Sequence, residues 1–169
     1  MNASQRKVLA GAASGIVSML LAMWGLTSIL PPVHAPTLAD RLACAAVANA
    51  FAAVPLFVML VVVGNGRFFS DAIDPTLGRE NQRMIVDGRV ADNTTQQFLI
   101  FAAATFALAA NIDEADLRVI DAAAIVFILA RVAFWIGYRI HPLHRAFGFA
   151  ATAYLNLGLL VAALWTAVR

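Results

Sequence analysis

The stretch ILARVAFWIGYRIHPLHR, residues 128–145, decides the fold class of this chain. It runs as an apolar segment through Arg131 and ends at Pro142, whose ring cannot continue a helix. Upstream the apolar character reaches Leu117, so Leu117–Tyr138 has the roughly 20 residues that a helix needs to cross a bilayer. A charge inside such a segment normally faces a bundle interior or a wet cavity. The stretch therefore predicts a membrane-spanning helix with one polar face.

Four other segments have the same length and character. They are Val8–Leu30, Leu42–Gly64, Asn93–Ile112 and Phe147–Val168. The chain is 62% hydrophobic and 13% charged over 169 residues, whereas soluble domains average about 45–50% apolar and about 25% charged residues. The remaining residues are too few for a soluble domain. We therefore predict an all-α integral membrane protein with five spans, whose immediate partner is the lipid bilayer.

The first apolar segment follows the basic pair Arg6 and Lys7, as a signal peptide would. Its apolar run is longer than the roughly 7–15 residues that are usual for a signal peptide. We therefore predict a retained helix. The chain then divides into residues 1–40, an N-terminal transmembrane helix with an external linker, and residues 41–169, a four-helix transmembrane domain.

Basic residues are distributed unequally over the two sides that five spans define. Eight lie on the side of the N-terminus and three on the other side, with Arg131 inside a span. The larger group is Arg6, Lys7, Arg67, Arg79, Arg83, Arg89, Arg139 and Arg145, and the smaller group is Arg41, Arg118 and Arg169. Because loops rich in Lys and Arg stay in the cytoplasm, we predict a cytoplasmic N-terminus and an external C-terminus.

Several classes of site find no support in the sequence. The single Cys44 excludes an intrachain disulfide and a cysteine metal site. His34 lies on the opposite side of the membrane from His141 and His144, so we expect no metal site. The basic residues are spread along one membrane face without interleaved aromatic residues, and we expect no nucleic-acid partner.

Two helices each bring one stripe of side chains to the cytoplasmic side, because residues at spacings of three, four and seven share a helix face. The stripes consist of Arg89, Asn93 and Gln96 on one helix and Arg131, Phe134 and Tyr138 on the next. The dipeptide Asp87-Gly88 predicts a turn before the first stripe, and Pro142 predicts a tight turn over Gly137–Arg145 after the second.

This combination of side chains suits a hydrophilic anionic ligand. Arginine binds carboxylates through paired hydrogen bonds, and Asn and Gln both donate and accept. The spacing is equally compatible with polar side chains that bond one another across helices and only hold the bundle together.

The two stripes and the downstream Arg145 resemble the MAPEG family, the membrane-associated proteins in eicosanoid and glutathione metabolism. The family has R-x-x-x-N-x-x-E on one helix and R-x-x-Y-x-x-G-Y on a later one. This chain has RVADNTTQ at residues 89–96 and RVAFWIGY at residues 131–138. Its NTTQQF run resembles the version found in bacterial members, which implies a bacterial inner membrane. The resemblance covers about Leu42–Val168, so Val8–Leu30 is a helix added before a MAPEG-like four-helix bundle.

The resemblance implies a homotrimer that binds glutathione near the cytoplasmic face, between neighbouring subunits. Carried over residue by residue, it implies that glutathione is held at Arg89, Asn93, Gln96, Arg131, Phe134 and Tyr138. It also implies a catalytic role for Arg145 near the thiol, because a guanidinium favours the thiolate form. The expected reaction is that of a transferase or peroxidase, and its second substrate is a lipophilic small molecule, an electrophile from the bilayer.

The chain departs from the family pattern at two site positions and at its N-terminus. Gln96 stands at the position of the family's Glu, and Phe134 at that of a Tyr. These departures and the added helix leave open a second hypothesis, a MAPEG-fold binding protein or a structural subunit of a larger membrane assembly. A third hypothesis is a small transporter or channel with a route lined by Asn49, Asp121, Arg131 and Asn156.

Overall fold

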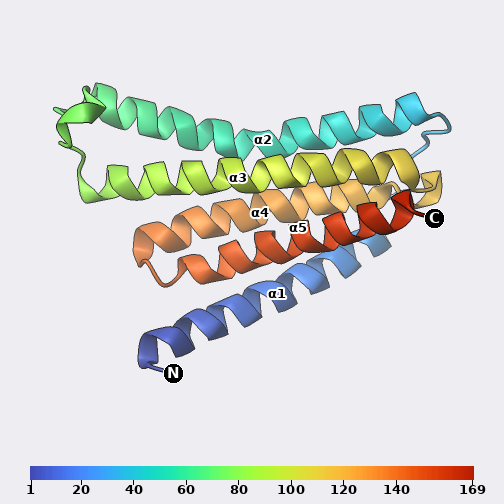
Figure 1. Cartoon of the computed structure of the whole chain (residues 1–169), viewed down its shortest axis with the longest axis horizontal. Coiled ribbons are helices and arrows are strands. Elements are labelled where there is room, and N and C mark those ends of the chain that lie inside the picture. Colours follow the sequence, from blue (N-terminus) through green and yellow to red (C-terminus); the bar gives the residue numbers. More distant parts are fainter.

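Five long helices make up most of the computed structural model, which describes residues 1–169 (Figure 1). In chain order they are α1 (Ala3–Ile29), α2 (Leu38–Phe68), α3 (Gln82–Asn111), α4 (Arg118–Ile140) and α5 (Arg145–Ala167). Two short 3-10 helices, η1 (Pro75–Leu77) and η2 (Glu114–Asp116), lie in the connections on either side of α3. The predicted all-α class with five helices is confirmed.

Four of the helices are long and apolar enough to cross a membrane, and α3 is the exception. Its 30 residues are more than sufficient in length, but residues 92–97 form an uninterrupted polar run. Figure 1 shows α3 alongside α2 and α4, and α3 also packs against α5. The neighbouring helices cover part of its polar surface, and Thr94 has no exposed area. The position of α3 among the spanning helices therefore rests on its tertiary packing.

The start of α3 differs from the prediction. The helix begins at Gln82, where the Asn81 side chain accepts a hydrogen bond from the backbone N–H of Met84 over 3.0 Å. The predicted turn at Asp87-Gly88 is wrong, because both residues lie inside α3. Asp-Gly marks a turn when the carboxylate bonds its own local backbone, whereas this carboxylate is buried in an ion pair.

The connection between α4 and α5 is shorter than predicted. Helix α4 continues to Ile140 and α5 begins at Arg145, so the turn occupies residues 141–144 rather than Gly137–Arg145. Gly137 permits this close return, because a Cβ at this position would lie 2.8 Å from the carbonyl oxygen of His144.

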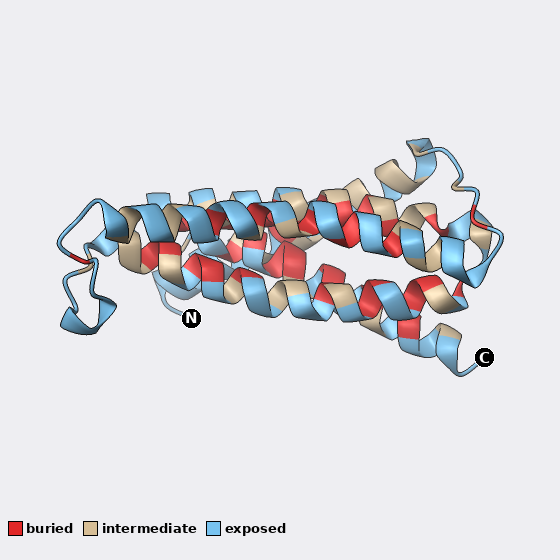
Figure 2. Ribbon diagram, turned by 90° about the horizontal axis from the view of Figure 1, so that it is seen from above, coloured by how far each residue is buried: buried red, intermediate tan, exposed pale blue.

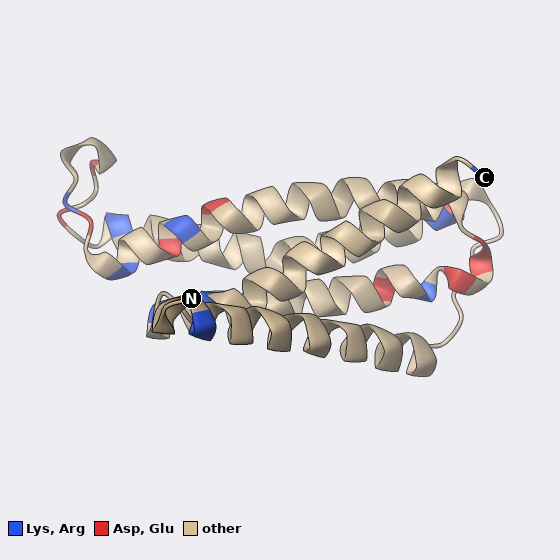
Figure 3. Ribbon diagram, turned by 60° about the horizontal axis from the view of Figure 1, so that its bottom comes forward, with Lys and Arg blue, Asp and Glu red and all other residues tan.

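The two ends of the bundle differ in charge. The N-terminus, the α2–α3 connection and the α4–α5 turn lie at one end, which we call the basic end, and the C-terminus lies at the other, the C-terminal end (Figure 1). Figure 3 shows most Lys and Arg positions near the basic end and a long stretch of bundle between the ends with few charges. This arrangement matches the predicted grouping of eight basic residues against three.

Small side chains form much of the core, along the inward faces that Figure 2 shows in red. Alanine and glycine let helices approach closely where lipid supplies no hydrophobic driving force. At Gly148 of α5, a Cβ would lie 2.4 Å from the backbone nitrogen of Phe134 in α4. The largest fully buried side chain in this core is that of Arg131.

Candidate functional site

A cavity of about 640 Å³ lies between α1, α3, α4 and α5 near the basic end. Five of the seven predicted site residues line it, namely Arg89, Asn93, Phe134, Tyr138 and Arg145. They come from three helices, so the fold brings together side chains that are up to 56 positions apart (145 minus 89). The remaining lining residues are mostly hydrophobic, so the cavity combines charged and polar groups with an apolar lining.

Two arginines converge on the Tyr138 hydroxyl. Arg145 Nη1 donates a hydrogen bond to this hydroxyl over 2.9 Å, and its guanidinium carbon lies 5.0 Å from the centroid of the Tyr138 ring. Arg89 places a second positive charge beside the same hydroxyl. Neither arginine forms an ion pair with a carboxylate, in contrast to Arg67 and Arg139. The wall thus carries two uncompensated positive charges, an arrangement suited to an anionic ligand.

Arg131 is enclosed by protein and does not line the cavity itself. Its Nη1 donates a hydrogen bond to Asn93 Oδ1 over 3.1 Å, and its guanidinium carbon lies 4.1 Å from the centroid of the Phe134 ring. Asn93 and Phe134 both line the cavity. Arg131 therefore influences the site by holding these two side chains in place. Its Nε and Nη2 atoms have no hydrogen-bond partner, which is costly for a buried charge.

Gln96 lies outside the cavity with an exposed side chain. The next residue, Gln97, faces α5, where Asn156 Nδ2 donates to the backbone oxygen and to Oε1 of Gln97 over 2.9 and 2.8 Å. Gln96 therefore lies apart from the predicted site residues that line the cavity. Its role in binding glutathione stays a prediction.

A partly buried ion pair close to the cavity residues was not predicted from the sequence. Asp87 of α3 accepts two hydrogen bonds from Arg139 of α4, from Nε and Nη2, each over 2.7 Å. Trp135 Nε1 donates a third to the same carboxylate over 2.7 Å, and the Arg139 guanidinium lies over the Trp135 ring. The four-residue spacing of Trp135 and Arg139 was the available signal, because it puts both on one helix face.

The ion pair fixes how the two motif-bearing helices face each other. Asp87 lies two residues before Arg89 on α3, and Arg139 directly follows Tyr138 on α4. A bidentate bond between a carboxylate and a guanidinium has a defined geometry. It therefore sets the rotation and register of α3 against α4 next to the residues that line the cavity.

The helices that meet at this cavity carry both predicted motifs in the expected order. The sequence profile of the MAPEG family matches residues 42–165. The chain belongs to the MAPEG family. No curated protein and no solved structure matches the chain. The profile runs from within α2 to within α5 and leaves out α1. A MAPEG bundle with an additional N-terminal helix is therefore confirmed, whereas the exact division after residue 40 stays a prediction.

The added helix contributes to the cavity of this MAPEG protein. Val8 and Ala12 of α1 form part of its apolar lining, together with Ala146 and Phe149 of α5. Helix α1 packs chiefly on α5 and also contacts α4. Residues outside the matched MAPEG region therefore help to shape the candidate site.

Two of the four polar residues considered for a transport route form hydrogen bonds between helices. Asn49 Nδ2 donates to the Ala45 carbonyl and to Thr105 Oγ1 over 2.8 and 2.9 Å, which joins α2 to α3. Asn156 joins α5 to α3 through Gln97, as described above. These side chains bond across helices, as polar residues in MAPEG-type and other membrane bundles are expected to do.

Proposed function

We propose that this MAPEG protein is a glutathione-dependent membrane enzyme, a transferase or peroxidase that acts on lipophilic electrophiles. The observation that carries the proposal is the pair of uncompensated arginines, Arg89 and Arg145, at the Tyr138 hydroxyl. Glutathione brings two carboxylates, amide groups and a thiol to such a wall. Arginine and asparagine side chains are the complementary donors and acceptors.

The residues present fit this ligand in a further respect. Arg131 has two unpartnered guanidinium nitrogens in the protein interior, and buried polar groups without partners are rare. An anionic ligand bound beside Asn93 and Phe134 offsets part of this unpaired charge. We assign Arg89, Asn93, Arg131 and Tyr138 to binding.

Arg145 is assigned a different role, in ionising the thiol. Glutathione supplies the nucleophilic sulfur when it is bound. A free thiol has a pKa of about 8.5, and a nearby guanidinium lowers this pKa by stabilising the thiolate. The apolar side of the cavity, including Val8 and Phe149, suits a second substrate that arrives from the lipid.

A second candidate function is a MAPEG-fold binding protein or assembly subunit without catalysis. It is favoured by the position of Gln96 outside the cavity and by the contacts that Arg131 and Arg145 already make within the protomer. On this hypothesis the polar side chains hold the bundle together.

Isothermal titration of the purified protein with reduced glutathione separates these functions, together with the ultraviolet absorbance of the thiolate. We expect a measurable heat and a thiolate signal. Arg145→Ala should reduce the thiolate signal more than it reduces binding. Arg169→Ala, at the opposite end of the bundle, is the matched control and should change neither. If the unmutated protein gives neither a heat of binding nor a thiolate signal, the enzyme function is excluded and the assembly subunit without catalysis remains.

The assembly and orientation are further parts of the proposal. We propose a homotrimer, because MAPEG membership and the alanine-rich run of residues 102–110 both favour close helix association. Native mass spectrometry in mild detergent should detect trimers, and monomers alone would contradict them.

We also propose a bacterial inner-membrane location with the N-terminus in the cytoplasm and the C-terminus outside. The unequal distribution of arginines supports this orientation. A reporter fused after Arg169 should behave as external, and one inserted near Thr76 as cytoplasmic. Reporters that appear on the same side would contradict the topology.

A further inference from the structure

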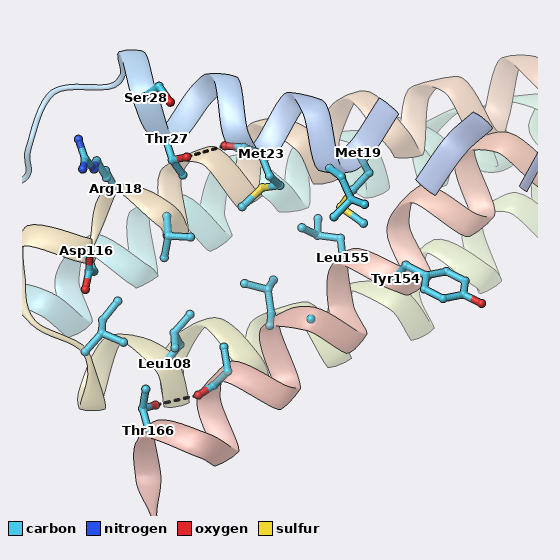
Figure 4. Close-up of a pocket in the computed structure, with 16 residues that line it drawn as sticks. Met19, Met23, Thr27, Ser28, Leu108, Asp116, Arg118, Tyr154, Leu155 and Thr166 are labelled. Atoms are coloured by element: carbon cyan, nitrogen blue, oxygen red, sulfur yellow. Dashed lines mark hydrogen bonds between the residues drawn. The ribbon is translucent and has the colours of Figure 1, made fainter. Parts of the chain in front are cut away.

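A second cavity lies at the C-terminal end of the bundle, between α1 and α5. It is a groove of about 730 Å³. Figure 4 shows α1 along one side and α5 along the other, diverging toward the end that holds Asp116 and Arg118. The two helices approach each other closely at Gly15, where a Cβ would lie 2.2 Å from the Phe147 carbonyl oxygen. They separate from that crossing onward, and the groove fills the angle between them.

The groove has the length and the lining of a site for one acyl chain. On α5 it extends from Tyr154 to Thr166, twelve residues along the helix, or about 18 Å. Half of a hydrocarbon core of about 30 Å is close to this length. Met19 and Met23 line the α1 side, and methionine adapts its shape to a flexible apolar partner.

Two opposite charges stand at the mouth of the groove without partners. Arg118 and Asp116 both line it, and neither side chain takes part in a salt bridge or hydrogen bond within the protein. The hydroxyls at the same end are already satisfied: that of Thr27 bonds the Met23 carbonyl, and that of Thr166 bonds the Ala162 carbonyl. One positive and one negative group therefore remain for a ligand.

We propose that this groove binds a phospholipid with a zwitterionic head group that carries a primary ammonium. Its phosphate contacts Arg118, its ammonium contacts Asp116, and one acyl chain lies along Met19, Met23 and Leu155. Charge complementarity selects this occupant. A purely anionic head group would satisfy Arg118 but would repel Asp116. The site depends on α1, which lies outside the matched MAPEG region, and it does not depend on glutathione chemistry.

Competition between two lipids tests the selectivity. The purified full-length protein is incubated with equal amounts of phosphatidylethanolamine and phosphatidylglycerol that carry the same acyl chains, and bound lipid is counted by native mass spectrometry. We expect retained phosphatidylethanolamine to exceed phosphatidylglycerol by about tenfold, the effect of one charge-assisted hydrogen bond. Asp116→Asn should abolish the preference, and Arg118→Ala should weaken retention of both lipids. Equal retention by the unmutated protein overturns the proposal.

A groove-filling variant tests the location. Gly158 lines the groove, and a Cβ there meets nothing within 4 Å. Gly158→Leu should therefore place its side chain in the groove and remove the bound lipid while the far-ultraviolet circular dichroism still shows a folded helix bundle. Gly64→Leu is the matched control, because a Cβ at Gly64 is equally free but lies away from the groove. Lipid retention in Gly158→Leu equal to that of Gly64→Leu overturns the proposal.

Discussion

The α3–α4 contact at the basic end and the α1–α5 contact are held together by different physical means. The first contains a bidentate ion pair between Asp87 and Arg139 with a third hydrogen bond from Trp135. The second depends on a close backbone approach at Gly15. Directional bonds fix rotation and register, so they suit a site whose side chains must meet. Close packing at the glycines near the start of α5 leaves the rest of the two helices free to diverge, and the groove lies where they diverge.

The largest expected effect comes from removing the acidic partner of the ion pair. Asp87→Ala removes the acceptor of three hydrogen bonds from Arg139 and Trp135, and each hydrogen bond to a charged group is worth about 1.5–3 kcal/mol. We expect a loss of this order in the free energy of unfolding, measured by circular dichroism in detergent with denaturant. Asp74→Ala is the control, because Asp74 is exposed and only caps η1. If the two variants unfold alike, the ion pair does not hold α3 to α4.

A smaller effect is expected at Arg131, in the site where we propose that glutathione binds. Arg131→Lys keeps the charge but loses the planar guanidinium that bonds Asn93 in the cavity wall, and a hydrogen bond to a charged group is worth about 1.5–3 kcal/mol. Glutathione affinity measured by titration should fall roughly ten- to a hundredfold. If Arg131 is structural, the variant should instead melt at lower temperature with no change in binding.

At the α1–α5 crossing, a single methyl group should be destabilising. The Cβ of Gly15→Ala would meet the Phe147 carbonyl, and overpacking costs about 1–3 kcal/mol. Gly25→Ala lies on the same helix with nothing within 4 Å and should be neutral or slightly stabilising. Thermal melts of both variants measure the difference, and equal melting would show that the close approach is not needed.

The smallest effect is expected at the polar contact between α2 and α3. Thr105→Val keeps the shape but removes the acceptor for Asn49 Nδ2, which still bonds the Ala45 carbonyl. Hydrogen bonds between helices in membranes average about 0.6 kcal/mol. The free energy of unfolding in denaturant should fall by about this amount. A loss as large as that of Asp87→Ala would show that charged and neutral contacts between helices contribute equally.

Hydrophobic segments and motif spacing were enough to predict the five helices, the MAPEG family and five of the twelve residues that line the cavity. Four of the spans can be recognised in the sequence, because a membrane-crossing helix needs a long run of apolar residues. Arg89, Asn93, Phe134 and Tyr138 were found because helical spacing puts them on shared faces, and they do line one cavity.

Tertiary structure alone decided which polar residues line the cavity and which remain enclosed by protein. Helical spacing places Arg131 with Phe134 and Tyr138, but the packing of α4 encloses its guanidinium against Asn93. The Asp87-Gly88 dipeptide predicted a turn, but Asp87 lies inside a helix and bonds Arg139. Local sequence could not reveal this partner, because it lies 52 positions away. The groove between α1 and α5 has no motif. It arises from the angle at which two apolar helices cross, and that angle depends on contacts between distant residues.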